Sequence, residues 1–148
     1  MPDFRTLPDD LAAEITELQG HGARLIGLDR TASPDEIVGA IKEKMGALRD
    51  EGVVPEEDDI VGLGVLLGEQ YVRRFDWHWA HVNFDDDFDD DNYFVCVLPV
   101  NNFLSINPIA WVNWILSGEK SNNVLLNFNM VAAGRVPQAG VNEAMGFY

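Results

Sequence analysis

The chain has 148 residues and a formal net charge of −15, with 25 acidic and 10 basic side chains, and 47% of its residues are hydrophobic. This composition is typical of one globular domain and excludes a collagenous, disulfide-rich or disordered acidic protein. An acidic surface repels the phosphates of nucleic acids and of anionic lipids. We therefore expect the chain to bind neither nucleic acid nor membranes, and to attract basic proteins.

The targeting and redox features of the sequence favour a cytoplasmic protein. The first residues, Met1-Pro2-Asp3, do not begin the basic and apolar regions of a secretory signal peptide. The longest uncharged stretch, residues 92–118, contains prolines and several asparagines, so it is unsuited to a membrane span. The one cysteine, Cys96, lies in an apolar segment, where we expect a buried and unreactive thiol.

Three helices are predicted in the first 75 residues, from apolar side chains that recur every three or four positions. These stripes are Leu11, Ile15 and Leu18, then Ile37, Ile41, Met45 and Leu48, then Ile60, Leu63, Leu67, Tyr71 and Phe75. The glycines within residues 20–22 are expected to end or bend the first helix, although Leu25 and Ile26 could continue its apolar stripe. Ser33 and Glu36 form a capping box that starts the second. In the third, Gly64 and Gly68 are expected to permit close approach by another element.

The residues that follow predict a sheet. Residues 76–84 alternate in polarity, residues 93–98 are rich in β-forming side chains, and residues 103–106 form a third short strand. Residues 100–102 have the composition of a tight turn, because asparagine tolerates a positive φ. An antiparallel three-stranded meander is the simplest arrangement of these segments.

Two short helices are predicted after the strands. The first starts at Asn107-Pro108 and ends near Ser117, and the second spans about residues 123–133. Residues 135–148 are expected to be irregular. The chain is therefore predicted to be a single α+β domain over residues 1–148, with three N-terminal helices, a three-stranded antiparallel sheet and two C-terminal helices.

Several motifs together resemble a pattern in small uncharacterised bacterial domains, in which an LG-x-x-LGE helix precedes a tryptophan-bearing strand and an Asn-Pro helix start. The matching segments are residues 63–69, Trp77-His78-Trp79, Asn107-Pro108 and residues 117–119, within a similarity over about residues 35–133. The resemblance implies an α+β fold and supplies no catalytic residue. Some of these domains occur in gene neighbourhoods that suggest contact-dependent immunity, which implies an immunity role.

Residues 85–91 form a dense acidic cluster. Six of the seven are aspartates: Asp85, Asp86, Asp87, Asp89, Asp90 and Asp91. Three interpretations stay open, namely a docking surface for a basic partner, a weak Ca²⁺ site, and a solvated loop that protects strand edges. A calcium-binding EF-hand loop is excluded, because its glycine and glutamate positions hold Asp90 and Cys96.

Motifs for catalysis and metal binding are not found in the sequence. His78 and His81 lie three apart on a predicted strand and therefore face opposite sides, so we expect no metal site and no cofactor. No nucleophile elbow, P-loop or dinucleotide fingerprint occurs. Glu69 is expected to pair with Arg73 one helical turn later.

The sequence thus favours a non-enzymatic acidic binding protein, with an immunity protein that neutralises a basic toxin as its concrete form and with an unspecified oligomeric state. The aspartates of residues 85–91, with Trp77 and Trp79, are the candidate partner-binding residues. One alternative is a small hydrolase or ligand-binding domain whose pocket lies near Trp77, Trp79, His81 and Glu69. Another is a weakly Ca²⁺-responsive module.

Overall fold

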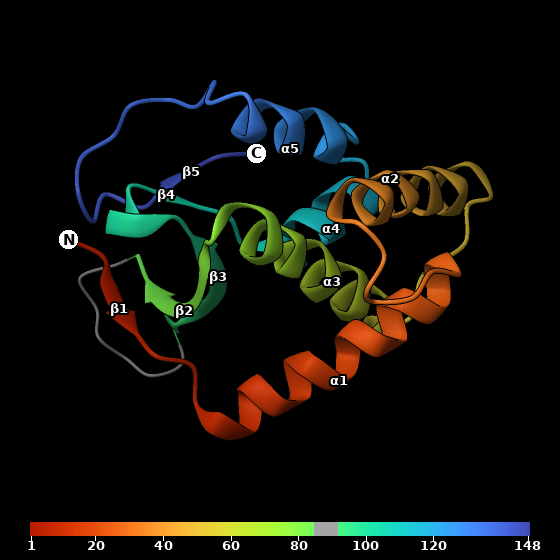
Figure 1. Ribbon diagram of the computed structural model, residues 1–148. Coiled ribbons are helices and arrows are strands. Elements are labelled where there is room, and N and C mark those ends of the chain that lie inside the picture. The colour runs from red at the N-terminus through yellow and green to blue at the C-terminus, as the bar shows by residue number, and fades with distance from the viewer. Residues whose placement is uncertain (85–91) are drawn as a thin grey trace.

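The computed structural model describes residues 1–84 and 92–148 and shows an α+β fold (Figure 1). The helices are α1 (Asp9–Ile26), α2 (Pro34–Asp50), α3 (Glu57–Phe75), α4 (Pro108–Leu116) and α5 (Val124–Ala132), with a short 3-10 turn, η2 (Val100–Asn102). The strands are β1 (Asp3–Arg5), β2 (His78–Asn83), β3 (Phe94–Leu98), β4 (Leu104–Ser105) and β5 (Met145–Gly146). Among the described helices, none is both long and apolar enough to cross a membrane.

The predicted α+β class is confirmed, with three helices before β2 and two after β4. Two predicted helix starts form through side-chain caps. The Ser33 hydroxyl accepts the N–H of Glu36 at 3.2 Å, and the Asn107 side chain accepts the N–H of Ala110 at 3.1 Å. The predicted turn after β3 also forms, and Asn101 adopts a φ of 67° there.

The predicted sheet is correct in its number of strands and in two of them, β2 and β3, but wrong in the third. Its order is β1-β2-β3, all antiparallel, and Phe4 of β1 pairs with Val82 of β2. Residues 103–106 do not form the third strand, because β4 pairs in parallel with β5 and Ile106 alone bridges to Val97 of β3. The C-terminal segment therefore contains a strand where an irregular tail was predicted.

Helix α3 lies at the centre of the domain, between α1 on one side and α4 and α2 on the other (Figure 1). Its glycines permit this crowding, as predicted. A β-carbon built on Gly64 would lie 2.7 Å from the Cα of Ile109 in α4, and one built on Gly68 would lie 2.5 Å from the Trp79 ring.

The expected break of the first helix at residues 20–22 is wrong. Helix α1 continues to Ile26 and ends at Gly27, which adopts a φ of 70°. Gly22 instead marks the crossing of α1 and α3, where its backbone packs directly on Gly62. A glycine inside a helix lowers the helix propensity of the sequence. Here the absence of a side chain permits the two helix backbones to touch.

The two faces of the sheet contact different apolar groups. The larger core fills the space between the sheet and the helices and includes Tyr71, Trp77 and Trp111, all buried. The opposite face carries a smaller cluster made of Ala80, Val82, Cys96 and Leu98, with Ala144 and Phe4 packed on it. This alternation places Trp79 and His81 on the helix-facing side of β2.

Candidate functional site

A groove lies where β3, the first turns of α3 and the start of α4 meet. It has a volume of about 580 Å³ and is open to solvent. Its lining consists of Pro55, Glu57, Ile60, Val61, Tyr93, Phe94, Val95, Asn107, Ile109, Ala110 and Asn113. Most of these side chains are apolar, and Glu57 is the one charged residue among the described residues that line the groove.

The backbone of Val95 faces this groove. Val97 exchanges two hydrogen bonds with Ile106, at 2.9 and 3.1 Å, on the side of β3 away from β2. Residues two apart on a strand direct their backbone groups to the same side, so the N–H and C=O of Val95 also point away from β2. Within residues 1–84 and 92–148, no backbone group pairs with them. An open stretch of sheet edge therefore borders the groove.

The chain creates this open edge by leaving β3 early. Ile106 is the last residue opposite β3, and Asn107-Pro108 turns the backbone into α4. Proline at the first helical position favours this change of direction, and the Asn107 cap completes it. The segment that contains Ile106 therefore does not extend to the position opposite Val95, and the groove occupies that position.

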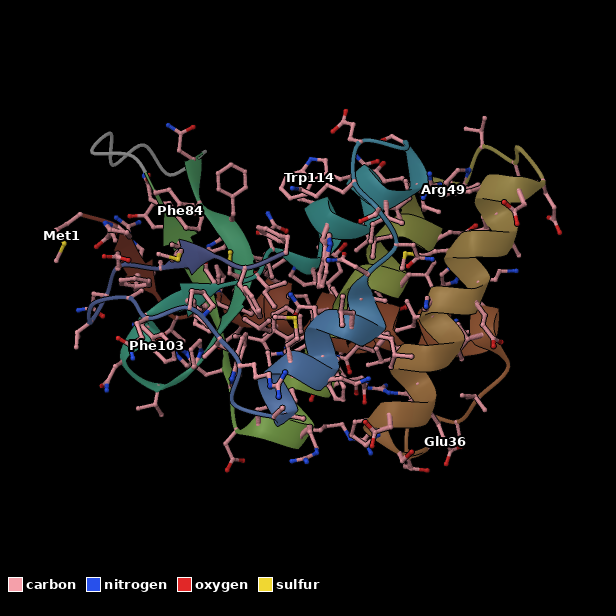
Figure 2. All side chains as sticks on the ribbon, turned by 90° about the horizontal axis from the view of Figure 1, so that it is seen from above. Met1, Glu36, Arg49, Phe84, Phe103 and Trp114 are labelled. Carbon is pink, nitrogen blue, oxygen red and sulfur yellow. The ribbon has the colours of Figure 1, made fainter. Side chains whose placement is uncertain are left out.

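Two exposed aromatic side chains lie beside the groove. Phe94, which lines it, is 49% exposed, and Phe84 is 40% exposed. Their ring centroids are 6.3 Å apart. Figure 2 shows Phe84, just after β2, and Trp114 on α4 along the same edge of the molecule. Exposed aromatic pairs of this kind are typical of protein-binding surfaces.

The candidate residues predicted from the sequence do not gather in one place. The six aspartates Asp85, Asp86, Asp87, Asp89, Asp90 and Asp91 lie outside the described residues, and so does the calcium interpretation attached to them. Trp77 is 6% exposed and packs on Tyr71, with ring centroids 5.2 Å apart, in the main core. Trp79 is half-buried and contacts α3. Trp77 is therefore buried inside the protein and is not available to a partner.

Trp79 and Glu69 do come together, as the alternative of a ligand pocket requires. One carboxylate oxygen of Glu69 accepts the indole N–H of Trp79 at 3.0 Å and the side-chain N–H of Gln19 at 3.1 Å. A cavity of about 310 Å³ adjoins them. Its lining includes Thr6, Asp9, Thr16, Gln19, Glu69 and Trp79.

The expected pair between Glu69 and Arg73 is wrong. Arg73 donates instead to the carbonyls of Arg30 and Ala32, at 3.2 and 2.9 Å, and to the Gln70 side chain. These contacts hold the α1–α2 connection against α3. Glu69 instead accepts from two neutral donors, Gln19 on α1 and Trp79 on β2.

His81 lies apart from that cavity, on the sheet. Its ring centroid is 5.8 Å from that of Tyr93, and the guanidinium of Arg5 lies 4.3 Å from the Tyr93 centroid. Burial, and to a lesser degree the charge of Arg5, lowers the pKa of His81. His78 points to the other face and contacts Asn102 at 2.8 Å, as the strand periodicity predicts. In the described part of the chain, no group of three potential metal ligands occurs.

Cys96 is fully buried on the outer face of the sheet. Burial raises the pKa of its thiol to about 12. The predicted buried thiol is therefore confirmed, and its thiolate is scarce near neutral pH.

The groove was not predicted from the sequence, although one local signal for it exists. The Asn107-Pro108 helix start comes directly after the short predicted strand of residues 103–106. A chain that turns into a helix so soon leaves the neighbouring strand with an open edge. Which strand that is depends on a pairing between Val97 and Ile106 that the sequence does not specify.

Comparisons of the chain with family models, curated proteins and solved structures each gave no match. The suspected resemblance to small bacterial domains therefore remains a prediction. The groove and the Glu69 cavity are interpreted below from their own geometry and chemistry.

Proposed function

We propose that the protein is a non-enzymatic binding protein that holds a basic protein partner. Neutralisation of a basic toxin, the task of an immunity protein, is the concrete form of this proposal. The observation that carries it is the groove beside β3, which is apolar, open to solvent and bordered by an exposed aromatic pair. Surfaces of this composition bind proteins more often than they bind polar metabolites.

The charge of the chain supports a basic partner. The formal net charge is −15, and Glu57 brings a carboxylate to the groove, while no lysine or arginine is among its described lining residues. Long-range attraction of this kind raises the association rate, and the apolar contact then limits dissociation. The binding rate is expected to fall steeply with salt, because ions screen the charges over about 8 Å at 0.15 M.

Selection of peptides from an unbiased display library tests this proposal without knowledge of the natural partner. The immobilised protein should enrich sequences that combine lysine or arginine with apolar residues, and their binding should weaken as salt is added. The charge-reversal variant Glu57→Lys should weaken this preference more than Glu14→Lys, on the exposed side of α1, which changes the net charge equally. Enrichment of neutral or acidic sequences, or none, contradicts the proposal.

A second candidate function is the binding of a small ligand in the cavity beside Glu69. The convergence of Glu69, Trp79 and Gln19 on a space of about 310 Å³ favours it. The carboxylates of Asp9 and Glu69 in its lining suit a small organic cation. A ligand there should change Trp79 fluorescence, and a screen of small amines that leaves this emission unchanged counts against this second function.

A further inference from the structure

We infer that the basic partner is bound as an extended segment that adds to the open edge of β3 at Val95, antiparallel to it, with an apolar side chain in the groove. The charge of the partner rests on the function proposed above. The mode of binding rests on the backbone geometry of β3 and on the lining of the groove.

The backbone geometry gives the position of the added segment and favours an antiparallel direction. Ile106 runs antiparallel to Val97 and exchanges two hydrogen bonds with it. A segment that continues this line reaches the N–H and C=O of Val95, which point into the groove. An extended backbone supplies the matching acceptor and donor at one residue, whereas a helix has already used its own backbone groups.

The groove selects the side chain of the paired residue. In an antiparallel pair, opposite residues point their side chains to the same face of the sheet. Val95 is on the helix-facing side of β3, since it lies two residues from Val97 of the main core. The paired residue of the partner therefore points toward Ile60 and Ile109, which line the groove, and an apolar side chain is required there.

The residues on either side of the paired one are expected to be basic. Their side chains alternate to the other face and to the open rim, where solvent keeps them charged. The chain is strongly acidic, and Glu57 in the groove adds to the negative field that these charges meet. A partner strand of alternating basic and apolar residues therefore fits both the open backbone edge of β3 and the negative charge of the protein.

The test uses the intact protein, labelled with ¹⁵N, and the peptide (Lys-Val)₄ with blocked ends. Binding should shift the Val95 amide resonance and slow its hydrogen exchange about tenfold. A peptide N-methylated at every valine has lost the donor that pairs with Val95, and its Kd should rise about tenfold. A peptide N-methylated at every lysine keeps that donor and should bind within about threefold of the parent.

Variants of the protein test the hydrogen bond donated by the Val95 N–H. Val95→Pro removes the N–H that points into the groove and spares the bonds to β2, so it should weaken (Lys-Val)₄ binding about tenfold. Val95→Ala keeps the N–H and is the matched control. Thermal melting shows whether both variants fold, and the N-methylated peptides keep the test decisive if Val95→Pro does not.

The outcomes separate this inference from the proposed function. Salt-sensitive binding of (Lys-Val)₄ that ignores N-methylation overturns strand addition and leaves the acidic binding function standing. Equal binding of (Glu-Val)₄ at Val95 supports strand addition and overturns the basic partner. A Val95 shift that follows protein concentration alone identifies a second copy of the chain as the occupant and overturns the inference, as does the absence of any peptide binding.

Discussion

Gly22 of α1 and Gly62 of α3 touch through their backbones, and a β-carbon built on Gly22 would lie 2.7 Å from the carbonyl carbon of Gly62. This contact sets the distance between the two helices. It also ties the N-terminal helix to the helix that carries Glu57, Ile60 and Val61 of the groove.

Gly22→Ala should lower the free energy of unfolding by about 2 kcal/mol, because overpacking of a helix contact outweighs the gain in helix propensity. The control is Gly39→Ala in α2, where a β-carbon meets nothing within 4 Å. That variant should raise stability by about 0.5–1 kcal/mol. Urea denaturation followed by circular dichroism measures both, and a destabilised Gly39→Ala or a stabilised Gly22→Ala contradicts the packing described.

Glu69→Ala should destabilise the protein by about 2 kcal/mol, because it leaves the Trp79 and Gln19 donors without their acceptor. Glu69→Gln keeps an acceptor oxygen and should cost about half as much. Glu43→Ala, at an exposed position of α2, should change stability by less than about 0.5 kcal/mol. Equal losses for Glu69→Ala and Glu43→Ala would show that the Glu69 contacts contribute nothing.

The lowered pKa of His81 makes stability depend on pH in a defined direction. The unfolded chain binds a proton at this residue more readily than the folded chain does, so stability rises with pH through this group. Its contribution is present above the ordinary value of 6.5 and is lost as pH falls from there toward the folded pKa. NMR titration of the His81 ring should give a midpoint below 6.5, and His81→Asn should reduce the slope of stability against pH in that window. A midpoint above 6.5 contradicts the burial described.

Cys96 should react slowly with a thiol reagent in the folded protein. Its thiol is buried and its pKa is raised to about 12, so little thiolate is present at pH 8. Ellman's reagent should therefore label Cys96 at least a hundredfold faster in denaturing urea than in buffer. Rapid labelling in buffer would show that this face of the sheet opens readily.

Local contacts were predictable from the sequence. Ser33 reaches the N–H of Glu36 three residues away, and the spacing of Ser, Pro and Glu specifies that cap without any other part of the fold. The helices of the first half follow in the same way from the periodicity of their apolar residues. Gly64 and Gly68 were also informative, because glycine in a helix interior needs a compensating contact.

Contacts between distant residues were not predictable. Phe4 of β1 pairs with Val82 of β2. A strand of three residues is too short for its alternation of apolar and polar side chains to predict such a pairing. Glu69 receives its donors from Gln19 and Trp79, fifty residues before it and ten after it, so the helix rule that favoured Arg73 lost to tertiary packing. The groove depends in the same way on the bridge between Val97 and Ile106.

The central position of α3 has a consequence for folding. Because α1, α2, α4 and β3 all pack on this one helix, fragments that end before it or begin after it lack the surface on which they assemble. We therefore expect excised halves to stay unfolded when separate and to regain structure when mixed, and we expect the slowest amide exchange in the middle turns of α3.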